Sequence, residues 1–275
     1  MTDHVRLGAR ELTLGYGATT IVDGLTVDVV AGAVTAIVGP NACGKSTLLR
    51  GLARLMNPVA GQVILDGSDI TRLRTKEVAR KLGLLPQSSI SPEGITVANL
   101  VTRGRFPHQT MLRQFSRDDQ QAVADAMAAT GVTAIAGRPV DQLSGGQRQR
   151  VWIAMVLAQQ TPLILLDEPT TFLDIAHQIE LLDLFADLNA EQGRTIVAVL
   201  HDLNHACRFA DQIIAMKAGS IVAQGNPAEI VTADLVEEVY GLRCQVIDDP
   251  ETGTPLVIPR ASARMRARRQ DPTRR

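Results

Sequence analysis

Short runs of consecutive apolar residues, rich in β-branched side chains, predict buried strands along this chain. The runs read VTAIV, LILL and TIVAVL and cover residues 34–38, 163–166 and 195–200. Amphipathic helices are predicted after the first and second runs, because apolar residues recur there every three or four positions. These positions are Leu48, Leu49, Leu52 and Leu55 after the first run, and Ile175, Ile179, Leu182 and Phe185 after the second. Buried strands that alternate with helices predict a parallel sheet covered on both faces.

Two further segments depart from this alternation. Residues 26–30 alternate polar and apolar side chains, as a half-exposed strand does. Residues 213–223 predict a β-hairpin with its turn at residues 217–220. We expect both segments to belong to a smaller antiparallel sheet that lies beside the parallel core.

The part of the chain between residues 88 and 160 predicts a helical insert. Residues 118–130 and 147–160 have helical patterns, and no strand pattern separates them. Asn226 and Pro227 mark another helix start, because Asn caps helices and Pro is favoured in their first turn. The fold class predicted from the pattern is therefore α/β, with a parallel core, an antiparallel β subdomain and an α-helical subdomain.

Length and composition are those of a globular protein with a substantial core. The 275 residues are 45% hydrophobic and 21% charged, and the formal net charge is -1. This balance gives no indication of binding to nucleic acid, which is therefore not an expected partner. Cys43, Cys207 and Cys244 are odd in number and widely spaced, which favours a reducing cytosol over a disulfide framework. The chain shows no run of about eighteen apolar residues and no signal-peptide core, so we do not expect it to span a membrane.

The C-terminal residues 259–275 have a composition of their own. Seven arginines lie between Arg260 and Arg275, without a periodic apolar face. Such a segment is typical of a solvated, disordered tail. The alternative is a contact with acidic lipid headgroups or RNA.

Residues 39–46 carry a phosphate-binding motif. Their sequence GPNACGKS fits G-x-x-x-x-G-K-[ST], with the strand 34–38 before it and a helix after it. In such a loop, backbone N–H groups and the positive end of the helix surround the phosphates. We expect Lys45 to pair with the β- and γ-phosphates of ATP, Ser46 to hold Mg²⁺, and Thr47 to reach the α-phosphate. The residues predicted to contact nucleotide are Gly39, Pro40, Asn41, Ala42, Cys43, Gly44, Lys45, Ser46 and Thr47.

Two adjacent acids follow the buried run 163–166. Successive strand residues point to opposite sides, so Asp167 can face a metal ion while Glu168 faces a water molecule. Phosphoryl transfer to water needs one carboxylate under Mg²⁺ and another that orients or deprotonates the nucleophile. The alternative is that both acids only cap a strand in solvent.

Residues 143–147, LSGGQ, precede a helix that is apolar on nearly all sides over residues 151–158. Ser144 and Gln147 have the S-x-x-Q spacing of a capping box. The two glycines between them leave N–H groups at the helix start open to an anion. A capped buried helix would explain this motif alone, but not its occurrence after the two preceding chemical motifs.

With these motifs in one chain, the sequence resembles the ATP-binding-cassette (ABC) ATPases over about residues 5–240. The resemblance implies a P-loop NTPase with a RecA-like parallel core. It also implies a homodimer of nucleotide-binding subunits packed head to tail, in which the signature of one subunit closes on the ATP of the other. The signature residues are Ser144, Gly145, Gly146 and Gln147.

The same resemblance implies roles for residues outside these motifs. Tyr16 matches the aromatic residue that stacks on adenine, and Gln87 the glutamine that reaches Mg²⁺ and the attacking water. Residues 171–174, ending in Asp174, match the loop that couples the two nucleotide sites, although the family often has Ser first. His201 matches the histidine that contacts the γ-phosphate. The implied metal ligands are Ser46, Gln87 and Asp167, and the implied catalytic residues are Glu168, His201 and Gln87.

Some of these residues have simpler interpretations. A tyrosine between two glycines, as Tyr16 is, can be a turn aromatic. His201 and His205 have a metal-ligand spacing, but Asp202 stands where the zinc-protease pattern needs Glu. Ala42 replaces a commoner glycine, which is harmless unless the position needs a positive φ.

Residues 100–108 and 159–178 resemble the ATPases of importers for iron–siderophore complexes, haem and vitamin B12, and the iron–siderophore members fit best. The resemblance implies permease subunits as membrane partners, an extracytoplasmic substrate-binding protein as an indirect partner, and a place at the cytoplasmic face of the membrane. Two alternatives stay open: a soluble ABC ATPase outside transport, and a nucleotide-sensing module that binds without hydrolysis. Glu168 argues against the second. The expected ATPase domain covers residues 1–258, with the helical insert at about 88–160.

Overall fold

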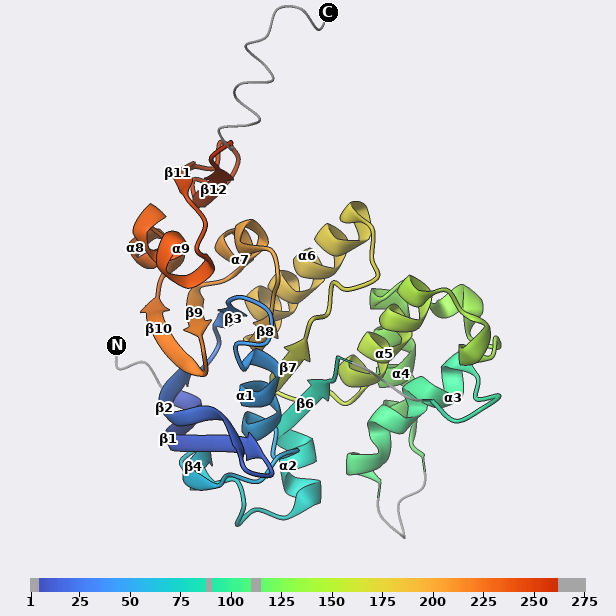
Figure 1. Ribbon diagram of the computed structural model, residues 1–275. Helices are drawn as coiled ribbons and strands as arrows, with labels where there is room; N and C mark the ends of the chain where they lie inside the picture. The colour runs from blue at the N-terminus through green and yellow to red at the C-terminus, as the bar shows by residue number, and fades with distance from the viewer. Residues whose placement is uncertain (1–4, 88–90, 110–114, 262–275) are drawn as a thin grey trace, which may run out of the picture.

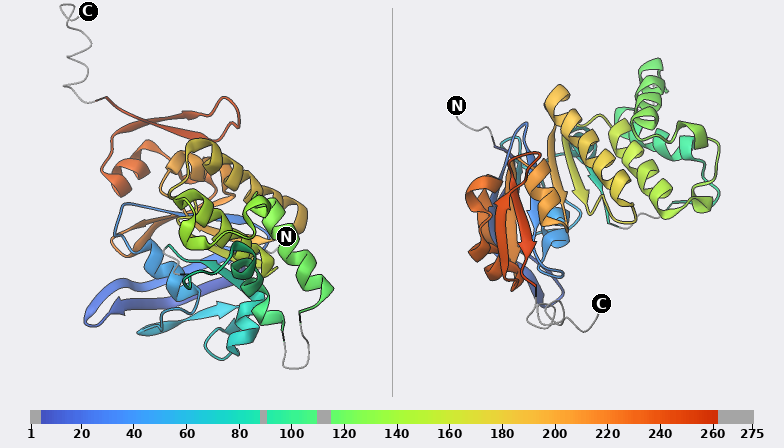
Figure 2. Two further views of the ribbon diagram at one scale, coloured as in Figure 1. Left: turned by 90° about the vertical axis from the view of Figure 1, so that its right-hand side faces the viewer. Right: turned by 90° about the horizontal axis from the view of Figure 1, so that it is seen from above.

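A computed structural model describes residues 5–87, 91–109 and 115–261 of the chain. The elements form an α/β lobe, which holds the strands, and a helical lobe that stands to one side of it (Figures 1 and 2). This confirms the predicted fold class.

The sheet at the centre of the α/β lobe has the strand order β10-β9-β3-β8-β7-β6 within the described residues. Its strands are β3 (Val34–Val38), β6 (Leu82–Leu85), β7 (Leu163–Asp167), β8 (Thr195–Val199), β9 (Gln212–Lys217) and β10 (Ser220–Gly225). All neighbours from β9 to β6 pair in parallel, and only β10 is antiparallel. Every residue of β7 and β8 is buried, as their continuous apolar runs predict.

Two hydrophobic cores cover the two faces of this sheet. Successive residues of β3 show the division, since Ala36 and Val38 belong to one core and Ile37 to the other. The helices of the α/β lobe are α1 (Lys45–Leu52), α2 (Thr75–Lys81), α6 (Ile175–Gln192), α7 (Leu203–Phe209), α8 (Pro227–Ile230) and α9 (Ala233–Tyr240). The predicted helix start at Asn226 is confirmed, because the Asn226 side chain caps α8.

A second sheet is antiparallel and has the order β2-β1-β4-β5 within the described residues. Its strands are β1 (Val5–Tyr16), β2 (Thr19–Val30), β4 (Ala60–Leu65) and β5 (Ser68–Asp69). The strand predicted at residues 26–30 is the end of β2. The assignment of the hairpin 213–223 to this sheet was wrong, because β9 pairs in parallel with β3 and so joins the central sheet.

The helical lobe lies between β6 and β7 in the sequence. Its helices are α3 (Val97–Thr102), η1 (Arg103–His108), α4 (Arg117–Ala129), η2 (Thr133–Ile135), η3 (Val140–Gln142) and α5 (Gly145–Ala158). The helices predicted at residues 118–130 and 147–160 are confirmed as α4 and α5.

The placement of Leu55 on a buried helix face was wrong. Helix α1 ends at Leu52, and the backbone of Arg54 turns into the left-handed region with φ 59°. This turn carries Leu55 out of the helical register, so that its side chain is 65% exposed.

The described chain ends with a hairpin that the hydrophobic pattern did not predict, formed by β11 (Cys244–Asp248) and β12 (Pro255–Pro259). It lies beside α7 in Figure 1. Most of the arginine-rich tail, from residue 262 onward, lies outside the described residues.

Candidate nucleotide site

The phosphate-binding loop links β3 to α1 and is held from behind by the turn between β9 and β10. The Gly219 N–H donates to the Cys43 carbonyl over 2.9 Å. Gly39 has φ 149°, and a Cβ at this position would lie 2.2 Å from the Met216 carbonyl oxygen. Only glycine fits there, because the loop runs against the backbone of β9.

The start of α1 is open to an anion. The N-cap residue Gly44 provides no side-chain cap, so the N–H groups of the first turn have no such partner. Lys45 lies in this turn, and its Nζ donates to the carbonyl oxygens of Gly39 and Pro40 at 2.8 and 2.9 Å. The Lys45 ammonium group and the open N–H groups therefore form a compact positive site, which suits phosphate.

Ala42 has φ 61° in this loop. The position therefore needs a positive φ, and alanine is unfavourable there because a residue with a Cβ is strained in the left-handed region. The glycine that the family more often has at this position would avoid that strain.

The Asp167 carboxylate lies directly behind Ser46. The Ser46 hydroxyl donates to Oδ1 of Asp167 over 2.8 Å, and Asp167 is only 2% exposed. Burial raises the pKa of Asp167, although Ser46 and Lys45 act in the opposite direction. A bound cation would offset this burial, and oxygen donors of this kind are those that Mg²⁺ prefers. The donor set therefore fits Mg²⁺.

Glu168 is turned out of the line of β7. It follows the last strand residue and has φ 55°, so its direction is set by a left-handed backbone and not by simple strand alternation. Its Oε2 lies 2.8 Å from Nε2 of His201, which follows β8. Burial alone would raise the pKa of Glu168, but hydrogen bonds from His201 and Gln87 hold it below the ordinary value. The carboxylate is thus kept ionised and able to accept a proton.

One cavity of about 530 Å³, a size suited to a small-molecule ligand, lies at these segments, although Gly39, Pro40, Cys43 and Asp167 do not line it. Five segments that are distant in sequence meet there. The lining residues are Ile21, Asn41, Ala42, Gly44, Lys45, Ser46, Thr47, Gln87, Glu168 and His201. Sequence reasoning did not identify Ile21, because nothing in the pattern of β2 marks it as a site residue.

The signature residues lie around a different cavity, of about 440 Å³. The predicted capping box is present at the start of α5, with Gln147 N–H donating to the Ser144 hydroxyl and Ser144 N–H to the Gln147 side chain. Asp174 also lines this cavity and caps α6 through the His177 N–H. No residue is shared between this cavity and the one around Lys45, so the two are separate on one chain.

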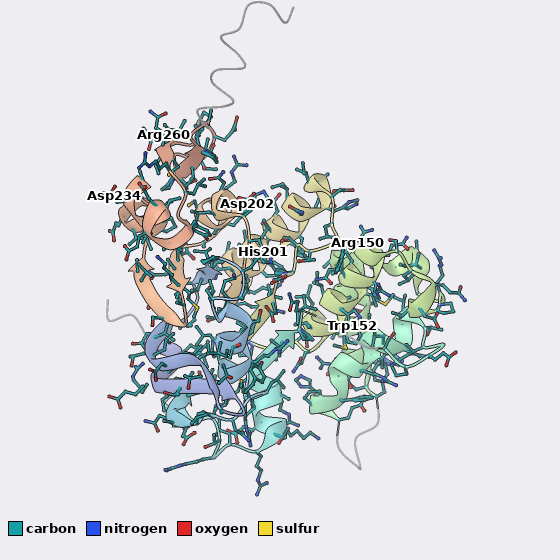
Figure 3. All side chains as sticks on the ribbon, in the orientation of Figure 1. Arg150, Trp152, His201, Asp202, Asp234 and Arg260 are labelled. Atoms are coloured by element: carbon teal, nitrogen blue, oxygen red, sulfur yellow. The ribbon has the colours of Figure 1, made fainter. Side chains whose placement is uncertain are left out.

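A third cavity, of about 490 Å³, shares lining residues with both of these cavities. Gln87 and Glu168 line it from the α/β lobe, and Gln149 and Trp152 from α5. Figure 3 shows His201 in the α/β lobe and Trp152 on the helical lobe. No sequence pattern distinguishes Gln149 or Trp152 as a site residue, because their helix is mostly apolar.

Tyr16 lies outside the cavity around Lys45. It ends β1, its side chain is 51% exposed, and its hydroxyl accepts a hydrogen bond from Arg50 of α1 over 3.2 Å. The contact with Arg50 places the ring beside the helix that follows the phosphate loop, with most of its surface open.

The comparison with known protein families decides which fold family carries this site. The ABC transporter family matches residues 22–171, which is more than half of the chain. The chain belongs to the ABC transporter family. The cavity around Lys45 therefore belongs to an ABC ATPase.

Several transport ATPases are close relatives of this chain. The ferric enterobactin transport ATP-binding protein of Escherichia coli is 59% identical over 260 residues, covering 94% of this chain and 96% of the relative. The petrobactin import ATP-binding protein FpuD of Bacillus anthracis is 53% identical, with 94% of each chain covered. The hemin import ATP-binding protein of Thermobifida fusca is 45% identical, with 93% and 89% covered.

Solved structures of ABC cassettes have the same fold. A dimeric bacterial ABC transporter cassette matches with a TM-score of 0.73 and 28% identity, covering 80% of this chain and 98% of the cassette. A dimeric cassette in a post-hydrolysis state, bound to ADP and Pi, matches with a TM-score of 0.72 and 28% identity. The match covers 80% of this chain and 98% of that cassette. Among the described residues, no helix is both long and apolar enough to cross a bilayer.

Proposed function

We propose that this ABC protein is the ATP-hydrolysing subunit of an importer for iron–siderophore complexes. The observation that carries the importer and its cargo is the 59% and 53% identity to the ferric enterobactin transport and petrobactin import ATP-binding proteins. The head-to-tail dimer rests on the separation of the phosphate loop and the signature into two cavities of one chain, which we interpret as two half-sites. A second copy packed head to tail would bring the signature of each subunit to the phosphate loop of the other. The solved dimers of similar cassettes support this arrangement.

Each half-site residue receives a role under this proposal. Lys45 and the N–H groups of α1 bind the triphosphate, while Ser46, Asp167 and Gln87 hold Mg²⁺, which neutralises phosphate charge when bound. Glu168 orients and deprotonates the attacking water, and His201 positions Glu168 and the γ-phosphate. Tyr16 stacks on adenine. Asp174 belongs to the loop that couples the two nucleotide sites of the dimer.

The proposed partners follow from the transport role. We place the protein at the cytoplasmic face of the membrane, bound to permease subunits that receive cargo from an extracytoplasmic substrate-binding protein. The proposed ATPase domain covers residues 1–258, with the helical insert at about 88–160. Of the predicted tail 259–275, Pro259 belongs to β12 and the Arg260 N–H donates to the Arg243 carbonyl, so we place the start of the separate tail after these two residues. Closure of the dimer around two ATP molecules would drive the permease, and hydrolysis would let the dimer open.

Substitution of Glu168 by Gln tests the assigned base. The variant keeps the size of the side chain but removes its ability to accept a proton. We expect MgATP binding to persist while turnover falls at least about a hundredfold, as the loss of a positioned base implies. The control is Asp183→Asn, the same chemical change on the exposed surface of α6, which should hydrolyse ATP normally. Hydrolysis by Glu168→Gln at the normal rate would refute the role of Glu168.

Substitution of Lys45 by Ala tests the phosphate site. The 5%-exposed Lys45 provides the charge that faces the phosphates. We expect the variant to lose MgATP binding in equilibrium dialysis while its circular dichroism spectrum stays unchanged. Tight MgATP binding by this variant would contradict the assignment of the loop.

Transport measurements test the cargo. The protein purified from its native membrane should carry a polytopic permease, and vesicles reconstituted with both should import ferric siderophore when ATP is present on the side of this subunit. Recovery of soluble partners only would contradict the importer role. The hemin import relative supports haem as the second candidate cargo. Uptake of hemin in place of ferric siderophore by the same vesicles would identify haem as the cargo.

A further inference from the structure

The C-terminal hairpin β11–β12 lies against α7, the short helix that follows His201. This helix begins two residues after His201, with Asp202 as its N-cap. The Asp202 carboxylate accepts the N–H groups of Asn204 and His205 at 2.8 and 3.1 Å. The direction of α7 therefore constrains the backbone that carries the His201 side chain.

One face of α7 is fixed in the core. Ala206 and Cys207 are 0% and 1% exposed and belong to a hydrophobic cluster of the central sheet. Two polar side chains, Asn204 and Arg208, are four positions apart and so lie one above the other on a helix. Both bind the hairpin.

Asn204 pairs with the hairpin as a neighbouring strand would. The Val257 N–H donates to Oδ1 of Asn204 over 2.7 Å, and Nδ2 of Asn204 donates to the Val257 carbonyl over 3.3 Å. Val257 faces Val246 in the β11–β12 ladder. The Asn204 amide thus joins α7 to β12 through both backbone polar groups of one residue.

Arg208 fixes the other end of α7. Its Nη2 and Nε donate to Oδ2 of Asp249 at 2.6 and 3.2 Å, and Asp249 is 6% exposed. The other oxygen of Asp249 accepts the Glu251 N–H over 2.9 Å, within the turn of the hairpin. A single buried carboxylate therefore holds both the turn and α7.

We infer that Asn204 and Asp249 are positioning residues for His201, and that the hairpin Cys244–Pro259 acts as a clamp that fixes α7 during ATP hydrolysis. The hairpin lies more than forty residues beyond His201 in the sequence, and α7 connects them in the structure. The His201 side chain is 46% exposed, so contacts around its own ring fix it only in part. The clamp restrains it through the backbone. This inference rests on the role proposed for His201.

The test uses Asn204→Leu and Arg208→Met in the full-length protein. Each removes the polar contacts of the clamp while keeping a side chain of similar bulk. We expect kcat for ATP hydrolysis to fall about tenfold, because displacement of a catalytic group by less than an ångström has effects of this order. The KM for ATP should stay within about twofold, since the phosphate loop is not part of the clamp. The control Arg243→Met removes an exposed ion pair with Glu237 outside the clamp and should leave kcat unchanged.

Combination with His201→Ala separates a positioning role from general destabilisation. If the clamp acts through His201, Asn204→Leu should lower the residual kcat of His201→Ala by less than twofold, because the two changes are coupled. An equal loss in both backgrounds, or an unchanged kcat in both clamp variants, would overturn the inference. If Asn204→Leu fails to fold, Arg208→Met gives the same comparison. Full activity of His201→Ala would instead overturn the role proposed for His201.

Discussion

A buried ion pair in the helical lobe allows a quantitative prediction of a change in the free energy of unfolding. Nε of Arg105 in η1 lies 2.8 Å from Oδ1 of Asp119 in α4, and the two residues are 5% and 3% exposed. Nη1 of Arg105 also donates to the Ala158 carbonyl at 2.7 Å and to the Gln160 side chain at 2.9 Å. One guanidinium group thus joins η1, α4 and the end of α5.

Substitution of Arg105 by Met should lower the free energy of unfolding by about 3–5 kcal/mol. Removal of one partner of a buried pair leaves the other charge without compensation, and losses of this size are typical. The Ala158 carbonyl loses its charged donor as well. The matched control is Arg243→Met, where the Arg243 side chain is 80% exposed and its partner Glu237 53% exposed. There the loss should stay below about 1 kcal/mol, because solvent screens the pair.

Urea unfolding at several pH values measures both effects. Burial alone would raise the pKa of Asp119, but hydrogen bonds from Ser116 and the charge of Arg105 lower it to about 2. Because the pKa is lower in the folded state, the contribution of the Asp119 carboxylate to the free energy of unfolding is complete above the unfolded pKa of 3.8. This contribution is lost as the pH falls through about 2. The difference in the free energy of unfolding between wild type and Arg105→Met should therefore become smaller from pH 5 to pH 2.5. Equal losses in the two variants, or a difference that does not change with pH, would refute this account.

Two further predictions concern backbone positions. Ala42→Gly should raise the free energy of unfolding by about 0.5–1 kcal/mol, because relief of a left-handed alanine is worth more than the added freedom of glycine in the unfolded chain; the melting temperature measures this, and a fall would contradict it. Gly104→Ala should destabilise the protein by at least about 1–3 kcal/mol, since the new Cβ would lie 2.2 Å from the Met155 carbonyl oxygen. Gly137→Ala, where no atom lies within 4 Å of the added Cβ, is its control and should be near neutral. Equal effects of the two glycine substitutions would show that close packing at Gly104 is not the cause.

The sequence by itself predicted the features that depend on one contiguous segment of the chain. Residues 39–47 form a loop and helix start whose chemistry depends on neighbours in the chain, so the motif alone indicated phosphate binding. The capping box of Ser144 and Gln147 spans four positions and is present as predicted. The strands β7 and β8 were equally clear, because strands buried on both faces are apolar throughout.

The tertiary structure decided what depends on segments far apart in the chain. The hairpin 213–223 could have joined either sheet, and the parallel pairing of β9 with β3 was settled by packing on the central sheet. The φ of Ala42 follows from the path of the loop, which β9 and the following turn restrict. The contact between Glu168 and His201 joins residues that follow different strands, and the direction of Glu168 comes from its left-handed backbone. The union of α7 with a hairpin near the C-terminus has no local sequence pattern at all, because hydrogen bonds between distant segments form only when the whole chain is packed.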